Sequence, residues 1–540
     1  MNHLDNKPNV AYFCMEFGID RALRIYAGGL GILAGDIMKT SREMDYPMVG
    51  IGLLWKKGYT KQLISENGDP YDSYPTYGYI YKHLKDTGVT VEVDIRHKTV
   101  YCKVWKLDKF DNAPLYLLDT NVPENTEENI RITNKLYSGS DELRISQEMI
   151  LGIGGIKAIN KLDLDIDIYH FNEGHAVLAG TELIKERMHK GEEFYEAWEN
   201  TRNEIVFTTH TPVKEGNESH DLDLLNNTGA FNGLTYQQME DIGGSPFNMT
   251  VAGLRLSKIS NAVSQLHGET AHKMWGNIDN IAPIKAITNG VHRKTWIDQE
   301  ITSKYKNKDK LWKLHQQHKK ELINYIKLHN AEKLDEDKLL IGFARRAAEY
   351  KRPDLIFRKP EIIAEYLENQ QIQLVFSGKA HPEDHIGKEI VAKLVDMAQK
   401  YDNSVVFIED YNIEVGKLMT KGVDVWLNNP RKPQEASGTS GMKAAMNGVL
   451  NLSILDGWWP EACEHGVNGW QFGDGHIGDN QDEHDLEALY QVLLNEVVPQ
   501  YYDDHNGWIE MMQNSIKTTV DRFSAKNMLN NYYNKLYDKL

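Results

Sequence analysis

The sequence predicts an α/β protein made of two doubly wound, Rossmann-like domains that face a central cleft. Three observations predict this fold. Short apolar runs rich in β-branched residues alternate with longer helical patterns along most of the chain, which is typical of parallel sheets. The runs form two series, separated by a Lys-rich stretch. The chain has 540 residues, more than one hydrophobic core usually serves, so we expect two domains.

We expect the first domain over residues 1–288. Helical patterns lie between several of its predicted strands, at Glu142–Asn160 and Ala176–His189. The predicted strands are Val10–Phe13, Met48–Leu53, Leu115–Leu118, Ile166–Phe171 and Ile205–Thr208.

We expect the second domain over residues 289–515. Near its start, alternating charges with leucines on one face predict a solvated amphipathic helix around residues 304–320, rather than a binding patch. We expect residues 516–540 to form a helix that packs back on the first domain. The predicted strands are Leu339–Phe343, Gln373–Phe376, Val405–Ile408, Val423–Leu427 and Val449–Leu455.

Composition argues against several classes of protein function. The net charge is 61 − 78 = −17, so nucleic acid and anionic membrane surfaces are not expected partners. The three cysteines, Cys14, Cys102 and Cys463, are far apart, which argues against disulfides and a cysteine metal site. No apolar run reaches the ~18 residues of a membrane span, and the first residues do not resemble a signal peptide. We therefore expect a cytoplasmic protein.

A glycine-rich turn lies within Ile25–Asp36. Gly29, Gly31 and Ala34 match the dinucleotide pattern G-x-G-x-x-A, so an NAD enzyme has to be considered. The match is weak, because no strand directly precedes the turn and Met48–Leu53 is followed by Trp and Lys rather than by an acidic residue. The turn still predicts a helix start that offers N–H groups to an anion.

Four cations lie in the segment Phe343–Arg352, directly after a predicted strand of an acidic protein. Open α/β sheets place their ligands at this end of the strands. The position favours an anion site, approached by Arg346 and Lys351, over a surface ion-pair network.

A run of small residues precedes Lys443 in the segment Pro433–Lys443. Small residues let a backbone approach a ligand, and a helix start binds anions, so Lys443 would stand beside an anion-binding turn. The alternative is a Ser/Thr-capped helix with a solvated lysine.

Histidines also follow two predicted strands, in His170–His175 and Thr208–Pro212. Their spacing is not that of a metal site, and such histidines are commonly structural.

Taken together, these segments resemble the α-glucan phosphorylases, a family of glycosyltransferases with the GT-B fold that use pyridoxal 5'-phosphate. The segment Glu435-Ala-Ser-Gly-Thr-Ser-Gly-Met-Lys443 is similar to the family's cofactor-lysine signature, and the resemblance covers nearly the whole chain. Other segments that occur in the family's order are Gly28-Gly-Leu-Gly31, Glu142-Leu-Arg144, Thr209-His-Thr211, Thr288-Asn-Gly290, Arg346 with Glu349-Tyr-Lys-Arg352, Ser377-Gly-Lys-Ala380, Asn447-Gly448 and Leu455-Asp-Gly457.

The resemblance implies reversible phosphorolysis. The terminal α-1,4-linked glucosyl unit of glycogen or maltodextrin moves to inorganic phosphate and gives α-glucose 1-phosphate with retained configuration. Residues 1–288 would carry the glucan side, and residues 289–515 would bind pyridoxal phosphate. The family is usually dimeric, so a homodimer is expected, and no metal is implied.

The resemblance also implies a role for each site residue. Lys443 would hold pyridoxal phosphate as a Schiff base. Arg346 and Lys351 would hold the substrate phosphate and act in catalysis with His210. The other positions implied at the cofactor are Gly438, Thr439, Arg345 and Trp296, and those implied at the substrate are Gly28, Gly29, Asn289, Tyr350, Glu435, Ala436 and Ser437.

Two departures resemble the short branch of the family. Ser440-Gly441 stands where Gly-Asn is usual, and Ala348 stands where a histidine is common. The first family strand begins about ten residues into the chain, so we expect no N-terminal control by AMP or by phosphorylation.

Competing hypotheses remain. A glycogen or starch synthase-like transferase would resemble K-x-G-G-L at the glycine turn, but Tyr26 stands at the place of that lysine. A non-catalytic glucan-binding protein would not need Lys443, Arg346 and Lys351. An NAD dehydrogenase is a distant third.

Overall fold

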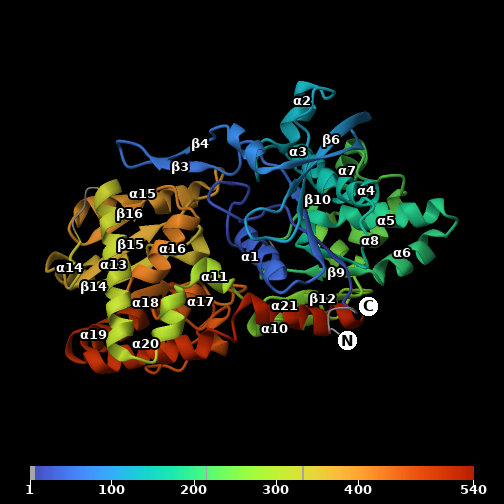
Figure 1. Cartoon of the computed structure of the whole chain (residues 1–540). Helices are drawn as coiled ribbons and strands as arrows, with labels where there is room; N and C mark the ends of the chain where they lie inside the picture. Colours follow the sequence, from blue (N-terminus) through green and yellow to red (C-terminus); the bar gives the residue numbers. More distant parts are fainter. Residues whose placement is uncertain (1–6, 214–215, 331–333, 540) are drawn as a thin grey trace. The chain divides into compact units, whose positions relative to one another are not determined.

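The computed structural model describes residues 7–213, 216–330 and 334–539 (Figure 1). The chain forms two compact units. Unit 1 is the described part of Met1–Tyr59, Tyr74–Thr288 and Met528–Leu540, and unit 2 is Thr60–Ser73 with Asn289–Asn527. Each unit has its own large sheet with helices packed on it, so the predicted α/β class is confirmed.

The sheet of unit 1 has nine strands in the order β13-β12-β9-β8-β1-β2-β7-β6-β5. The seven strands from β13 to β7 run parallel, and every strand predicted in this region is present. The strands are β1 (Val10–Phe13), β2 (Met48–Leu53), β5 (Lys85–Ile95), β6 (Lys98–Leu107), β7 (Leu115–Asp119), β8 (Ile168–Asn172), β9 (Ile205–Thr208), β12 (Ile259–Ala262) and β13 (Ile284–Ala286).

The antiparallel hairpin of β5 and β6 was not predicted. The second half of β5 alternates buried and exposed residues, a pattern that marks a sheet with one solvated face. Arg96 and His97, the two residues between the strands, both have positive φ, as a tight hairpin turn requires. A search for alternation, rather than for continuous apolar runs, would have found it.

The predicted helix Glu142–Asn160 is present as α3 and α4, joined by a π-helical turn at Ile150–Gly154. Unit 1 also contains the short antiparallel pair β10 (Ser219–His220) and β11 (Phe247–Asn248). Its helices are α1 (Gly29–Glu43), α2 (Glu127–Ile130), α3 (Asp141–Met149), α4 (Gly155–Lys161), α5 (Leu178–His189), α6 (Phe194–Arg202), α7 (Leu222–Thr228), α8 (Tyr236–Gly243), α9 (Met249–Leu256), α10 (Gln265–Trp275) and, from Met528 onward, α21 (Ala525–Lys535).

The sheet of unit 2 has six parallel strands in the order β16-β15-β14-β17-β18-β19. The chain runs outward from β14 in one direction and then outward from β17 in the other. The carboxyl ends of β14 and β17 therefore form the topological switch point where doubly wound sheets bind ligands. The strands are β14 (Leu339–Ala344), β15 (Ile372–Ser377), β16 (Val405–Ile408), β17 (Val425–Asn428), β18 (Leu450–Ile454) and β19 (Gly469–Phe472).

Helices cover this sheet, with α15 packed on β16 and α16 on β14 (Figure 1). The antiparallel hairpin of β3 (Lys61–Ile64) and β4 (Pro70–Ser73) also belongs to unit 2. The helices are α11 (Arg293–Trp296), α12 (Gln299–Lys304), α13 (Lys308–Asn330), α14 (Pro360–Glu368), α15 (His385–Lys400), α16 (Ile413–Gly422), α17 (Thr439–Met446), α18 (Gln481–Val492), α19 (Val498–Asp503) and α20 (His505–Thr519). Within the described ranges, no helix combines the length and apolarity of a membrane span.

Helix α13 corrects one expectation about the Lys-rich stretch. The stretch is helical as predicted, but Lys319 is fully buried rather than solvated. Its Nζ lies 2.7 Å from Oδ2 of Asp424 and 2.6 Å from the carbonyl oxygen of Lys338. A buried ammonium group needs such partners, because leaving water costs it hydration energy.

Candidate functional site

Arg345 lies at the switch point of the unit 2 sheet. It directly follows β14, and its backbone N–H donates to the Ser377 carbonyl at the end of β15 (3.2 Å). Its guanidinium donates to Oδ1 of Asn428, the last residue of β17. Asn428 in turn donates to Oγ of Ser453 on β18 (3.1 Å). The carboxyl ends of four neighbouring strands therefore hold one cation in place.

A cation pair formed by Arg345 and Lys351 lies against Glu435. One oxygen, Oε2 of Glu435, is 2.6 Å from Nη1 of Arg345 and 2.5 Å from Nζ of Lys351. All three side chains are almost fully buried, at 9%, 8% and 7% exposure. Burial alone would raise the pKa of the Glu435 carboxyl, but the two cations outweigh it and lower this pKa to about 2. Glu435 is therefore an ionised carboxylate at neutral pH.

Tyr350 lies beside the same pair, with Nζ of Lys351 4.6 Å from the centre of its ring. Burial opposes ionisation of the phenol, but Lys351 and Arg346 together lower the pKa of Tyr350. The side chain of Arg346 is exposed. The pair that grips Glu435 is thus Arg345 with Lys351, with Arg346 close enough to act on Tyr350.

The backbone around Glu435 is fixed by the loop after β18. Asp456 accepts hydrogen bonds from the N–H groups of Glu435 and Gly457, both at 2.9 Å. The N–H of Trp458 donates to the Ser437 carbonyl at 2.9 Å. A Cβ at Gly457 would lie 2.3 Å from that carbonyl oxygen, so the close approach requires glycine.

Asp456 itself was not predicted as a site residue. Burial, helped by the nearby Glu435 charge, raises the pKa of Asp456 to about 7 despite the two N–H groups. Its position as a polar residue two places after a buried strand is the signal that could have found it.

Lys443 projects from α17 and is buried at 6% exposure. Its Nζ lies 3.6 Å from the centre of the Trp296 ring, within cation–π range. Asn447 joins the two segments, since its Nδ2 donates to the Trp296 carbonyl (3.0 Å) and its Oδ1 accepts from the Asp298 N–H (3.1 Å). The structure thus brings the amine of Lys443 together with Trp296, the aromatic residue that the resemblance implies at the cofactor.

The turn before α17 offers polar groups to a ligand. Gly438 has φ +84°, a left-handed conformation that favours glycine, and α17 begins at Thr439. Oγ of Ser437 and Oδ1 of Asn289 are buried without a hydrogen-bond partner. Buried polar atoms are normally paired, so such orphans fit a site that is completed by a polar ligand.

In unit 1, the glycine turn opens α1 beside Glu16, which follows β1. The Glu16 carboxylate accepts hydrogen bonds from the N–H groups of Ala27 (2.6 Å) and Gly28 (3.1 Å). A Cβ at Gly28 or Gly29 would meet no atom within 4 Å, so the turn borders open space. The predicted helix start is present, and the N–H of Gly28 already donates to a carboxylate.

His210 follows β9 in the same unit. Its N–H donates to Oε1 of Glu173 (2.6 Å), and its Nε2 lies 2.6 Å from Oδ1 of Asn172. Burial, with a contribution from neighbouring histidines, lowers the pKa of His210 to about 3, so the ring is neutral near pH 7. Because an amide oxygen faces Nε2, that nitrogen carries the proton and Nδ1 keeps a free lone pair.

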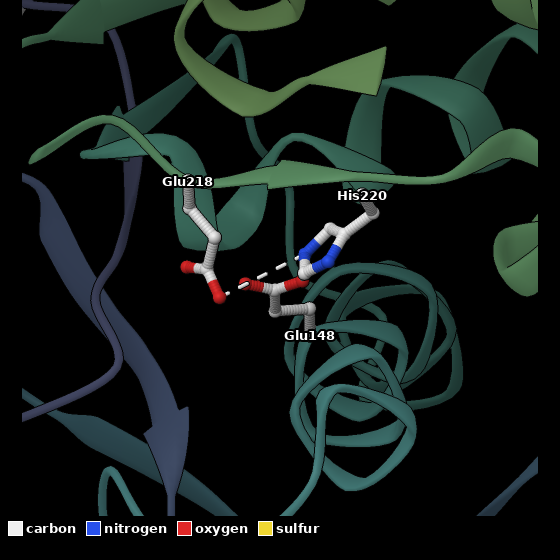
Figure 2. A group of neighbouring side chains, drawn as sticks. All are labelled: Glu148, Glu218 and His220. Carbon is white, nitrogen blue, oxygen red and sulfur yellow. Dashed lines mark hydrogen bonds and ion pairs between the residues drawn. The ribbon is translucent and has the colours of Figure 1, made fainter. Parts of the chain in front are cut away.

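One further cluster in unit 1 has the spacing of a metal site. Atoms of Glu148, Glu218 and His220 all lie within 4.8 Å of one another. Figure 2 shows Glu148 rising from a helix, α3, toward the other two side chains. Nε2 of His220 is 3.1 Å from Oε2 of Glu148 and 3.7 Å from Oε1 of Glu218. We call these three residues the Glu148 cluster.

Arg144, one turn before Glu148 on α3, supplies positive charge to this cluster. Its Nε and Nη2 donate to the two oxygens of Glu218 at 2.9 and 3.1 Å, and Nε is 3.5 Å from Glu148. Despite burial, this guanidinium lowers the pKa of Glu218. Burial also opposes a charged His220, but Glu148 and Glu218 raise its pKa. Burial and the nearby Glu218 charge raise the pKa of Glu148 to about 7. Arg144, His220 and a proton on Glu148 can therefore balance the charge of the cluster without a metal.

We expect neither zinc nor EDTA to change the melting temperature of the parent protein, because Arg144 already balances the cluster. Arg144→Met should cost about 3–5 kcal/mol of unfolding free energy, the cost of breaking a buried ion pair. Zinc should then recover part of the melting temperature of this variant. The control is Arg131→Met, which breaks an exposed pair with Glu127. A zinc response of the parent protein, or none in Arg144→Met, would contradict the argument.

The predicted site residues fall into a few groups. Arg345, Lys351 and Tyr350 surround Glu435, and Lys443 lies against Trp296. Ala436, Ser437 and Gly438 lead into α17 at Thr439, and Asn289 belongs to the same unit. The predicted site residues of unit 1 are Gly28, Gly29 and His210.

Comparison with known proteins gave a consistent result. The family model described as carbohydrate phosphorylase matches residues 299–468. The chain is 38% identical to a maltodextrin phosphorylase of Thermococcus litoralis, over 98% of this chain and 70% of that protein. It is 36% identical to a glycogen phosphorylase of Aquifex aeolicus, over 99% of this chain and 87% of that protein. A glycogen phosphorylase of Mycobacterium tuberculosis is 33% identical, over 98% and 70%.

Proposed function

Because the chain belongs to the carbohydrate phosphorylase family, we propose that it is an α-1,4-glucan phosphorylase that depends on pyridoxal 5'-phosphate. The terminal glucosyl unit of glycogen or maltodextrin is transferred reversibly to inorganic phosphate, giving α-glucose 1-phosphate with retained configuration. The observation that carries the proposal is a buried amine, Lys443, in the same unit as a buried cation pair at the switch point of its sheet.

The residues present fit the cofactor. Lys443 would hold it covalently against Trp296, while Arg345 and the start of α17, at Gly438 and Thr439, would receive its phosphate. The unpaired Oγ of Ser437 also supports a polar ligand at this turn. When bound, the cofactor supplies a phosphate with a second pKa near ~6, which can exchange a proton with the substrate phosphate at neutral pH.

Lys351 and Arg346 would bind the substrate phosphate, with the N–H of Gly29 as a further donor, since the N–H of Gly28 donates to Glu16. Lysine and arginine in one segment place two cations on one dianion, and charge-assisted hydrogen bonds are the strongest that side chains make. Tyr350 lies beside Lys351 and would therefore border the substrate phosphate.

Glu435 and His210 would bind glucosyl hydroxyls rather than transfer protons to the glycosidic oxygen. Glu435 has a pKa of about 2 and His210 a pKa of about 3, so neither has a proton to give near pH 7 in this structure. Both can accept hydrogen bonds, Glu435 through its carboxylate and His210 through Nδ1. Asn289, Ala436 and Ser437 would complete the hydroxyl contacts. A glycosidase needs two carboxyl groups in acid and base roles, whereas the mechanism proposed here leaves proton exchange to the two phosphates.

The proposal includes the domain arrangement expected of the family. Residues 1–288, apart from Thr60–Ser73, would form the glucan-side domain and Asn289–Asn527 the cofactor domain, and the two would face a cleft as in the GT-B fold. The chain from Met528 onward belongs to unit 1. A cytoplasmic homodimer is proposed on family membership.

We expect the purified protein to release glucosyl units from maltoheptaose only when inorganic phosphate is present. The product should be α-glucose 1-phosphate, measured by coupled assay and by proton NMR of the anomeric signal. Incubation without phosphate is the control for hydrolysis. Transfer from a nucleotide-activated glucose without phosphate-dependent cleavage would contradict the proposal and favour the synthase alternative.

A further inference from the structure

One oxygen of Glu435 contacts two of the four cations in the segment Phe343–Arg352. Arg345 and Lys351 approach Oε2 to 2.6 and 2.5 Å, and the three side chains are buried together. Two contacts this short to a single oxygen leave little room for another anion on the same faces of the cations. In this structure Glu435 therefore acts as their counter-ion.

The proposed function, on which this inference rests, asks the same cations to bind phosphate. The cofactor phosphate is assigned to Arg345 and the substrate phosphate to Lys351. Glu435 carries one negative charge, whereas each phosphate carries close to two at neutral pH. The ammonium group of Lys351 has three N–H donors, but it is buried and already lies 2.5 Å from the Glu435 carboxylate. A phosphate dianion that binds the same ammonium group would repel this carboxylate at close range, which favours displacement of Glu435 from Nζ.

The exchange needs only a side-chain rotation, because the backbone on both sides of Glu435 is held. The Glu435 N–H donates a hydrogen bond to the Asp456 carboxylate at 2.9 Å, and the Trp458 N–H donates one to the Ser437 carbonyl at 2.9 Å. A displaced carboxylate would remain buried, since Glu435 is only 6% exposed, and a buried carboxylate requires hydrogen-bond donors. Hydroxyl groups of a glucosyl unit are donors of the right kind.

We propose that Glu435 is an exchangeable counter-ion that couples the two substrates: the incoming phosphate dianion displaces it from Lys351, and the released carboxylate then binds glucosyl hydroxyls. A glucan that draws Glu435 away frees Lys351 for the anion. By linkage, each substrate must then tighten the binding of the other by the same factor.

The test uses the full-length protein loaded with pyridoxal phosphate, and sulfate as the probe. Sulfate is a tetrahedral dianion that cannot accept a glucosyl unit, so binding is measured without turnover. We titrate sulfate calorimetrically, alone and with saturating maltopentaose, for the parent protein and for Glu435→Gln. Melting temperatures at increasing sulfate give an independent measure of binding.

In the parent protein, maltopentaose should tighten sulfate binding by about 10-fold, the scale of one charge-assisted hydrogen bond. Glu435→Gln removes the competing charge at nearly constant shape, so it should bind sulfate about 10-fold tighter without maltopentaose and lose the coupling. Its melting temperature should be low without anions and should rise more with sulfate than that of the parent. Glu349→Gln is the matched control, because this exposed glutamate of the same segment pairs with Arg431 instead and should leave sulfate binding unchanged.

Equal sulfate affinity in the presence and absence of maltopentaose in the parent protein would overturn the proposal, even if Glu435→Gln did not fold. Unchanged sulfate affinity in a folded Glu435→Gln would overturn it as well. Failure of the proposed function looks different. Sulfate binding that Lys351→Met does not weaken would show that these cations are not the anion site.

Discussion

Lys443→Met is expected to lack covalently bound pyridoxal phosphate and to retain less than about one-thousandth of the parent rate of phosphorolysis, because the amine that holds the cofactor is gone. The variant should still fold. Lys443 is buried at 6% exposure against Trp296, and methionine fills a similar volume without a buried charge. Absorbance near the ultraviolet–visible boundary measures bound cofactor, a phosphorolysis assay measures the rate, and a melting curve checks that the variant folds.

The matched control for Lys443 is Lys417→Met. Lys417 also faces the Trp296 ring, but its Nζ lies 6.0 Å from the ring centre, compared with 3.6 Å for Lys443. This variant should keep the cofactor and most of the activity. Borohydride reduction of the parent protein followed by peptide mapping should find the modified lysine at 443. Modification of another lysine, or an active and cofactor-loaded Lys443→Met, would contradict the assignment.

The strands were predictable because parallel strands buried on both faces appear as continuous apolar runs. The predicted bounds of β1, β2, β9 and β16 agree with those in the structure. The hairpin of β5 and β6 was not predicted because its buried residues alternate with exposed or half-buried ones, so it contains no such run. The burial of Lys319 was not predicted for a different reason. Its partner Asp424 is 105 residues away, and a helical pattern does not show which charge will find a buried partner.

The candidate site also contains features that local motifs could predict and contacts that they could not. Local motifs predicted anion binding at the cationic segment after β14 and at the small residues before Lys443. Strand ends and helix starts bind anions for reasons local to the chain, so such positions can be proposed from sequence. The pairing of Lys351 with Glu435 spans 84 residues. The hydrogen bond from the Glu435 N–H to the Asp456 carboxylate spans 21 residues and depends on the loop after β18. Such contacts follow from sheet topology, which the sequence pattern alone leaves open.

Lys351→Met is expected to lower catalytic efficiency toward phosphate by about 10²–10⁴-fold. If Lys351 makes two charge-assisted hydrogen bonds to the substrate phosphate, each contributes roughly 1.5–3 kcal/mol, or about 3–6 kcal/mol together in the transition state. Methionine keeps most of the apolar stem of lysine, so packing around Tyr350 should survive. Cofactor content should stay normal, since Lys443, Arg345 and the start of α17 are intact. The measurement is phosphorolysis of maltoheptaose as a function of phosphate concentration.

Lys359→Met is the control for Lys351→Met, because Lys359 is an ion-paired lysine of the same unit that contacts Glu483 and Glu487 at the surface. Surface pairs contribute little, so this variant should keep the phosphate kinetics of the parent. Near-parent phosphate kinetics in a folded, cofactor-loaded Lys351→Met would remove Lys351 from the substrate site. Loss of cofactor with an unchanged melting curve would instead move Lys351 to the cofactor phosphate, and the substrate phosphate would then depend on Arg346, the exposed cation beside Tyr350.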